Sequence, residues 1–152
     1  RSKKMKFAHT LFAALAIGLS GMAACAPAIA QTQIEASLTQ TTDYATSGDF
    51  VRKSKRLKGS WSVVERDGKT FIAFDEDFRA ANGPDLKVFL SPNSVANATG
   101  KNAVNGSVNI GVLKKTRGVQ EYEVPAGINL SDYGSVLIHC EAYSVLWGGS
   151  DL

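Results

Sequence analysis

Cysteine and histidine are scarce in this chain of 152 residues, which holds two of each. Cleavage of an N-terminal signal would remove Cys25 and His9 and leave Cys140 and His139. One cysteine cannot form an intramolecular disulfide, and one cysteine with one histidine falls short of a zinc cage. The haem-attachment motif Cys-x-x-Cys-His and the hydrolase motif Gly-x-Ser-x-Gly are absent. We therefore expect no metal, no cofactor and no independent catalytic activity.

The N-terminus has the pattern of a secretory signal, with a basic start and an apolar run from Leu11 to Leu19. Ala28-Ile29-Ala30 fits the small-x-small cleavage rule, so we predict a signal peptide at residues 1–30. The alternative is lipoprotein processing at Met22-Ala23-Ala24-Cys25, which would acylate Cys25. The apolar run is too short to span a bilayer. Both alternatives predict a periplasmic or secreted domain, lipid-anchored in the second case.

Charge gives little support for nucleic-acid binding. Removing Arg1, Lys3, Lys4 and Lys6 from the 17 basic residues leaves 13 against 14 acidic ones, a balance of −1. Local basic density remains at 52–58 (RKSKRLK), where a solvated edge or loop competes with a contact patch for an acidic partner or a lipid headgroup. The acidic run Asp75-Glu76-Asp77 lacks the spacing of a calcium loop, so we expect a wet turn there.

The remainder of the chain predicts one β domain. Residues 31–46 are rich in Thr, Gln, Ser and Ala and are predicted to be a flexible lead-in to a domain at 47–152. Asp67-Gly68 between β-rich runs predicts a hairpin, and no long segment has helical periodicity. We expect an antiparallel all-β sandwich or partly open barrel, with strands at 60–65, 70–74, 85–90, 107–113, 119–124, 135–141 and 143–147.

Cys140 lies within the predicted strand 135–141, where neighbouring side chains point to opposite faces. Alternation predicts a core face of Val136, Ile138, Cys140 and Ala142, and an opposite face of Leu137, His139, Glu141 and Tyr143. A direct pair between His139 and Cys140 is therefore excluded if the strand is regular. Free cysteine is often buried, and burial makes a thiol inert, so these residues alone favour a structural cysteine. Tyr143 and Trp147 are expected to pack on one face of the next strand.

Three stretches in order resemble the DM-thirteen domain family, also called the electron-transfer DM-thirteen domain. They are NGPDLKVFLS at 82–91, GVQEYEVP at 118–125 and YGSVLIHCEAYSV at 133–145. The resemblance implies a compact extracytoplasmic β domain whose hallmark is a single cysteine, here Cys140, with a redox role. Members often carry a histidine in the first strand region, where this chain has Lys55-Arg56-Leu57-Lys58-Gly59, and this departure weakens any metal or haem ligation carried over from the family.

Two functions from different classes follow. The first is an electron-transfer accessory in which Cys140 is a redox thiol that cycles through an oxidised state or a mixed disulfide with a separate redox or membrane protein. The second is a non-catalytic protein- or ligand-binding β-sandwich in which Cys140 is structural.

Overall fold

The computed structural model describes residues 45–152. The predicted signal peptide, Cys25 and nearly all of the lead-in at 31–46 lie outside the described residues. In chain order the strands are β1 (Ser47–Asp49), β2 (Val51–Arg52), β3 (Leu57–Lys58), β4 (Ser60–Arg66), β5 (Lys69–Phe74), β6 (Arg79–Ala80), β7 (Leu86–Ser91), β8 (Val108–Val112), β9 (Gln120–Glu123), β10 (Ser135–Cys140) and β11 (Val145–Asp151). Two short 3-10 helices, η1 (Leu130–Asp132) and η2 (Glu141–Tyr143), complete the regular structure. No helix within 45–152 is long and apolar enough to cross a membrane.

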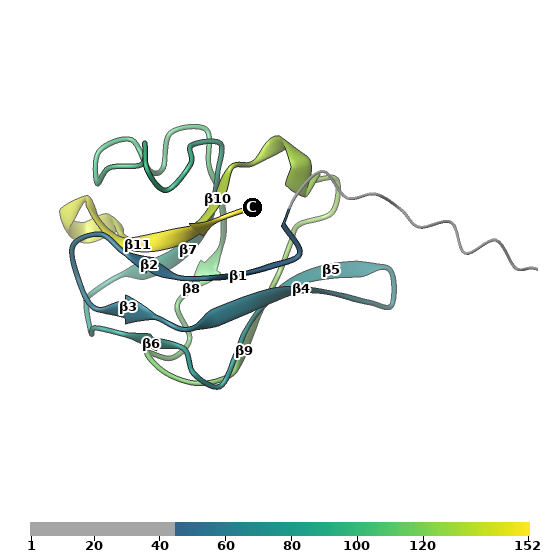
Figure 1. Ribbon diagram of the computed structural model, residues 1–152. Coiled ribbons are helices and arrows are strands. Elements are labelled where there is room, and N and C mark those ends of the chain that lie inside the picture. Colours follow the sequence, from purple (N-terminus) through teal and green to yellow (C-terminus); the bar gives the residue numbers. More distant parts are fainter. Residues whose placement is uncertain (1–44) are drawn as a thin grey trace, which may run out of the picture. The chain divides into compact units, whose positions relative to one another are not determined.

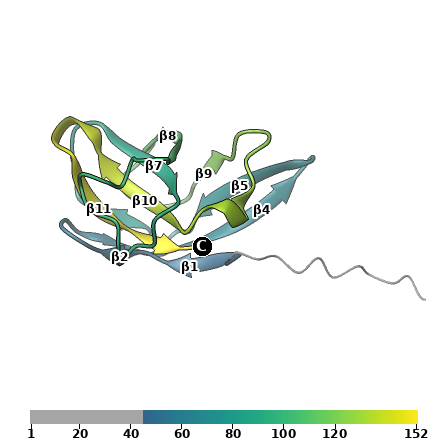
Figure 2. The same cartoon turned by 90° about the horizontal axis from the view of Figure 1, so that it is seen from above.

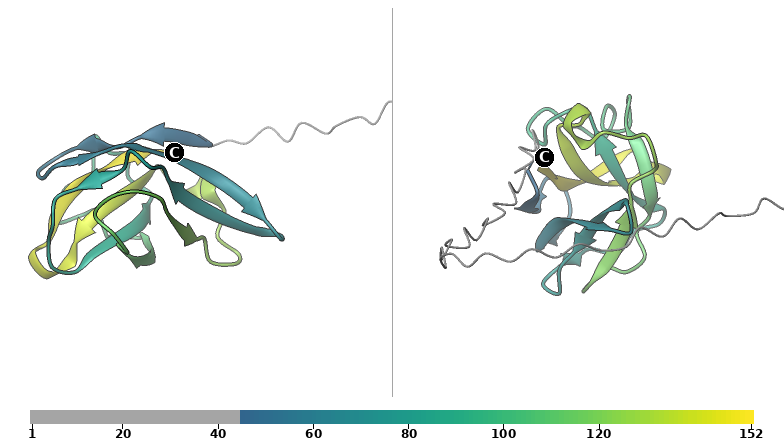
Figure 3. Two further views of the ribbon diagram at one scale, coloured as in Figure 1. Left: turned by 90° about the horizontal axis from the view of Figure 1, so that it is seen from below. Right: turned by 90° about the vertical axis from the view of Figure 1, so that its right-hand side faces the viewer.

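The strands form two main antiparallel sheets and one small one (Figure 1). The first sheet has the order β1-β4-β5-β9 and the second has the order β2-β11-β10-β7-β8. The small sheet pairs β3 with β6. Two sheets stacked as layers, not closed into a barrel, confirm the prediction of an all-β sandwich (Figure 3).

The hairpin predicted at Asp67-Gly68 is present. β4 pairs with β5 so that Arg66 lies opposite Lys69, and only Asp67 and Gly68 make the turn. Both turn residues have positive φ, 54° and 71°, which a two-residue turn needs to match the twist of the strands. Aspartate followed by glycine is the sequence signal for that backbone, because glycine carries no Cβ to oppose it.

One length of chain joins the two main sheets at Phe50. β1, before Phe50, pairs with β4 of the first sheet, and β2, after it, pairs with β11 of the second. The Phe50 ring is buried and lies edge-on to Phe74 and Phe78, with centroids 4.9 and 5.4 Å away. These aromatic contacts fix the corner where the chain changes sheets.

The main core fills the space between the sheets. Trp61, Ile72, Phe74 and Tyr122 enter it from the first sheet. Leu90, Val136, Ile138, Cys140 and Trp147 enter it from the second. Burial of apolar side chains from both layers is the dominant stabilising contribution in a sandwich of this kind.

The outer face of β10 is buried as well, which alternation alone did not predict. Leu137, on that face, belongs to a second apolar cluster with Phe89, Leu146, Val95, Ala98 and Ala103. The last three lie in the segment between β7 and β8, which folds over the sheet. A covering loop therefore gives β10 two buried faces, whereas Ala142, predicted to be in the core, is exposed in η2.

The strand predicted at 143–147 is wrong at its start. η2 and Ser144, whose φ is 51°, reverse the chain so that Val145 pairs with Cys140. Strand β11 then continues to Asp151. Tyr143 is 71% exposed and Trp147 is 4% exposed, so the two side chains do not share a packed face. The turn has no Gly, Pro or Asn signal, because a serine takes the left-handed position. Figure 2 shows this turn and the β4–β5 turn at opposite ends of the domain.

Candidate redox-thiol site

Cys140 is the last residue of β10 and lies between two partner strands. It is opposite Leu86 of β7 on one side and Val145 of β11 on the other. Its side chain is 0% exposed and belongs to the main core. It is the one free cysteine of the described residues. The resting conformation therefore holds the thiol as a small apolar side chain that no reagent in solution can reach.

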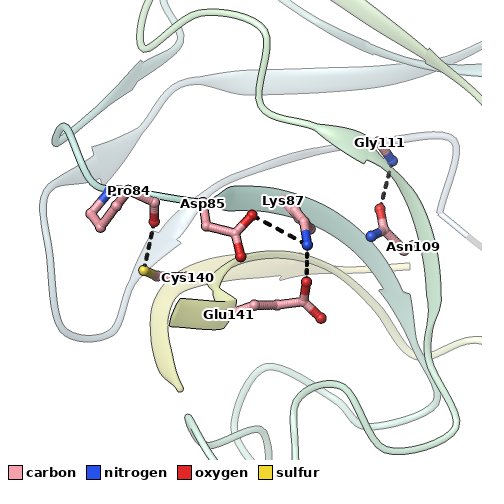
Figure 4. A network of polar contacts seen from close by, with 7 residues as sticks. All are labelled: Pro84, Asp85, Lys87, Asn109, Gly111, Cys140 and Glu141. Carbon is pink, nitrogen blue, oxygen red and sulfur yellow. Dashed lines mark hydrogen bonds and ion pairs between the residues drawn. The ribbon is translucent and has the colours of Figure 1, made fainter. Parts of the chain in front are cut away.

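The thiol makes one polar contact. Its Sγ donates a hydrogen bond to the carbonyl oxygen of Pro84, 2.8 Å away (Figure 4). A carbonyl oxygen only accepts, so the sulfur carries its proton in this arrangement. We call the segment Gly83–Asp85, which makes this contact, the thiol cover.

The thiol cover is tied to η2 by an ion-pair bridge. The ammonium of Lys87 contacts the carboxylates of both Asp85, at 3.2 Å, and Glu141 (Figure 4). The backbone N–H of Glu141 also donates to the carbonyl of Asp85, at 3.2 Å. The hydrogen bonds to Glu141 and then to Asp85 raise the pKa of Lys87 above its ordinary value. Asp85 has a φ of 53°, a left-handed conformation that costs a non-glycine residue about 1 kcal/mol or more.

The cation of Lys87 does not serve the thiol. Cys140 lies opposite Leu86, whose side chain enters the core, whereas Lys87 lies opposite His139. Successive strand residues point to opposite faces, so the ammonium is on the other side of the sheet from Sγ. The two carboxylates already engage its charge. Positive charge nearby activates a thiol, and Lys87, on the opposite face of the sheet, does not supply it.

His139 lies on the outer face, as alternation predicted, and makes no pair with Cys140. It is 2% exposed, its Nε2 lies 2.8 Å from the carbonyl of Gly100, and its ring is edge-on to Phe89. Because that carbonyl can only accept, Nε2 donates this hydrogen bond. Nδ1 has no hydrogen-bond partner among residues 45–152. The geometry excludes imidazole as the base for the Cys140 thiol.

Within the acidic run at 75–77, Asp77 has a structural role, because it binds the start of β4. Asp77 accepts hydrogen bonds from the backbone N–H and the hydroxyl of Ser60, at 2.9 and 3.0 Å. These bonds hold the pKa of Asp77 below its ordinary value. Within the described range, no group of three or more His, Cys, Asp or Glu side chains is placed to hold a metal ion.

The family model described as electron transfer DM13 matches residues 49–151, from β1 to the last residue of β11. The chain belongs to the electron transfer DM13 family. No curated protein and no solved structure matches it. The resemblance seen in the sequence is therefore confirmed, and the description of DM13 domains supports a general redox role.

Two features of this DM13 domain's site could not be found from sequence. Pro84 and Cys140 are 56 residues apart, and only the pairing of β7 with β10 brings them together. Lys87 reaches Glu141 for the same reason, across 54 residues. The sequence indicated the strand that carries Cys140 but had no signal for the carbonyl that contacts the thiol or for the ion pairs that hold the thiol cover.

Proposed function

We propose that this chain is an exported electron-transfer domain in which Cys140 is the redox thiol and becomes reachable when the thiol cover opens. The family supports the redox role. The contact between Sγ and the Pro84 carbonyl is the observation that favours opening of the thiol cover as the way in which the thiol becomes reachable. That contact places one short segment of chain directly on the sulfur. The proposal requires that segment to move so that the thiol is exposed.

The cover is weakly fastened for a segment that protects a core residue. Its ion pairs use carboxylates that are 41% exposed in Asp85 and 37% exposed in Glu141, and exposed ion pairs contribute little to stability. The left-handed backbone of Asp85 stores strain that opening would release. Segments with few buried contacts open locally at a lower free energy than global unfolding. The cover therefore has the features of a low-stability unit over a stable core.

In the open form the thiol meets water and a partner disulfide. The Cys140 thiol loses its proton to water, and the sulfur attacks one sulfur of a disulfide in the partner protein. A mixed disulfide forms, the partner's own S–S bond breaks, and its leaving thiolate takes up a proton. Cys140 is oxidised and the leaving sulfur is reduced. A separate dithiol protein, the electron donor, then attacks the Cys140 sulfur and releases the first partner as a dithiol. The donor's second thiol attacks the new mixed disulfide, so the donor is left as a disulfide and Cys140 returns to the thiol.

The proposal places this reaction outside the cytoplasm. The N-terminal pattern supports cleavage after Ala30, with acylation of Cys25 as the alternative that would hold the domain on a membrane. Disulfide exchange is sustained in such compartments. Residues 45–152 contain a single thiol, so the electrons pass to or from a separate redox or membrane protein.

Oxidised glutathione serves as a model disulfide for the test. The exported protein is incubated with it under native conditions, and the intact mass and the modified peptide are measured. We expect a mixed disulfide on Cys140 that dithiothreitol reverses and that is absent from the Cys140→Ser variant. A native protein that forms no adduct, while the denatured protein does, would refute the redox role of this thiol.

The second candidate is a non-catalytic binding domain in which Cys140 is structural. The observation that favours it is the complete burial of the side chain in the main core. In that case Sγ acts as a packed apolar atom with one hydrogen bond, and the absence of any adduct on native protein is the expected result.

A further inference from the structure

The chain from β2 to β3 carries an unbalanced positive charge. We call residues 52–58 the basic arm; its cations are Arg52, Lys53, Lys55, Arg56 and Lys58, all exposed. None of them forms an ion pair with an acidic side chain of residues 45–152. The arm lies at the same end of the domain as η2, away from the β4–β5 turn (Figure 1).

The small sheet extends this charge across the strands. Lys58 lies directly opposite Arg79, and Arg79 lies opposite Arg117 on its other side. Like charges directly opposite each other destabilise a sheet. Asp77, in the acidic run before β6, accepts hydrogen bonds from Ser60, and its charge also interacts with that of Arg79. The Arg79 guanidinium donates its hydrogen bonds to backbone carbonyls. The row of cations therefore forms no ion pair with a carboxylate of residues 45–152.

Three cations elsewhere in the domain are paired with carboxylates, whereas Lys101, Lys114 and Lys115 form no ion pair within residues 45–152. On the first main sheet, Arg66 pairs with Glu121 at 3.0 Å and Lys69 pairs with Glu123 at 2.9 Å. On the second, Lys87 is bound by two carboxylates. The arm is therefore distinguished by density, because five exposed cations lie within seven residues and none of them is paired. A local field of one sign attracts a ligand of the opposite sign.

An open pocket of about 380 Å³ adjoins the arm. Apolar atoms line much of it, and Lys53 lies at its edge, where its ammonium donates to the carbonyl of Ala96 at 3.2 Å. The lining residues are Lys53, Ser54, Ala96, Ala98, Thr99, Gly100, Ser144, Val145 and Leu146. Ser144 and Val145 directly follow η2, so the pocket borders the turn that is tied to the thiol cover.

We infer that the basic arm and this pocket form a docking surface for an acidic segment of a partner protein. Several carboxylates of the segment contact the arm, and one apolar side chain enters the pocket. The cations extend over β2, β3 and β6, which is wider than a single small anion. The apolar lining of the pocket gives an apolar side chain of the segment a surface to pack on, which a polar lipid headgroup would not use. A partner docked here lies beside η2. Its binding does not require Cys140 to react, so the docking proposal and the proposed redox function can be tested independently.

The probe is a fluorescein-labelled peptide with a central phenylalanine flanked by glutamates, and binding to the exported protein is followed by fluorescence anisotropy at low salt. The arm is tested with Lys55→Gln/Arg56→Gln. The matched control is Arg66→Gln/Lys69→Gln, which removes the same charge at the other end of the domain. We expect the arm variant to weaken binding by about tenfold and the control by less than about twofold. Equal weakening by the two variants overturns the proposal.

The pocket is tested with Ala96→Trp, which fills it, against Ala126→Trp, an exposed alanine elsewhere on the surface. We expect Ala96→Trp alone to remove the preference for the phenylalanine peptide over one with glycine in its place. The docking surface is refuted if the wild type shows no such preference or does not bind the peptide. Arm-dependent binding to phosphatidylglycerol vesicles without peptide binding would also refute it and would identify the surface as membrane-facing. Thermal melts verify that every variant is folded.

Discussion

The thiol of Cys140 and the carbonyl of Pro84 are joined by a hydrogen bond of 2.8 Å, although the residues belong to segments 56 positions apart. This bond links the last residue of β10 to the segment that directly precedes β7. It makes Cys140 both a packed core residue and the donor that holds the thiol cover. The effects of substitution at Cys140 should reflect both roles.

Cys140→Ser should lower the free energy of unfolding by about 1 kcal/mol, because the hydroxyl is more costly to bury than a thiol but still finds the Pro84 carbonyl as its acceptor. Cys140→Ala should cost about 1–2 kcal/mol, because it loses both the donor and the packing of sulfur. Urea denaturation of the three proteins measures this order. A serine variant less stable than the alanine variant would show that the hydrogen bond does not stabilise the fold.

Lys87→Gln should increase the rate of Cys140 alkylation several-fold at neutral pH, since it removes the bridge from η2 to the thiol cover. The control is Lys69→Gln, which breaks the ion pair with Glu123 far from the thiol. High salt should speed alkylation of the wild type and leave the Lys87 variant little changed. Identical rates in the wild type and the Lys87 variant would show that the bridge does not restrain the cover.

Alkaline pH should destabilise the domain through Tyr122. Burial raises the pKa of Tyr122 to about 12, above the ordinary value of 10.0. The stabilisation associated with the protonated phenol is complete below pH 10 and is lost as the pH rises toward 12, because the unfolded chain releases its proton first. Tyr122→Phe should flatten the decline in unfolding free energy between pH 10 and 12. Parallel pH profiles for the two proteins would contradict this assignment.

Gly59→Ala should destabilise the domain far more than Gly68→Ala. Both glycines have positive φ, but a Cβ at Gly59 would lie 2.4 Å from Cα of Phe78, whereas one at Gly68 meets nothing within 4 Å. The second change therefore adds only backbone strain, about 1 kcal/mol. The first also forces β4 away from the segment that enters β6. Thermal melting compares the two variants. Similar losses of melting temperature would mean that the close approach between Gly59 and Phe78 contributes nothing to stability.

Local sequence signals predicted the parts of the fold that depend on neighbouring residues. Asp67-Gly68 indicated its hairpin because both residues accept the backbone that the turn requires. The turn at Ser144 was missed for the converse reason, since a serine in the left-handed region has no signal in the sequence. The strand predicted from Tyr143 therefore began too early.

The environment of Cys140 depends on pairing between distant strands. Alternation correctly separated the Cys140 and His139 side chains, because that separation is a property of one strand. It did not predict that the segment between β7 and β8 covers the outer face of β10. Nor did it bring Pro84 to the thiol or Lys87 to Glu141, because register between β7 and β10 sets both contacts.

The dependence of Cys140 alkylation on denaturant tests the opening of the thiol cover most directly. Alkylation of the native exported protein is measured from zero to moderate urea, and the modified residue is identified by peptide mass. Local opening exposes little surface, so we predict a rate that is nearly independent of urea below the unfolding transition and faster than global unfolding permits. A rate that follows the full urea dependence of global unfolding down to zero denaturant would contradict the redox proposal and leave Cys140 as a structural residue.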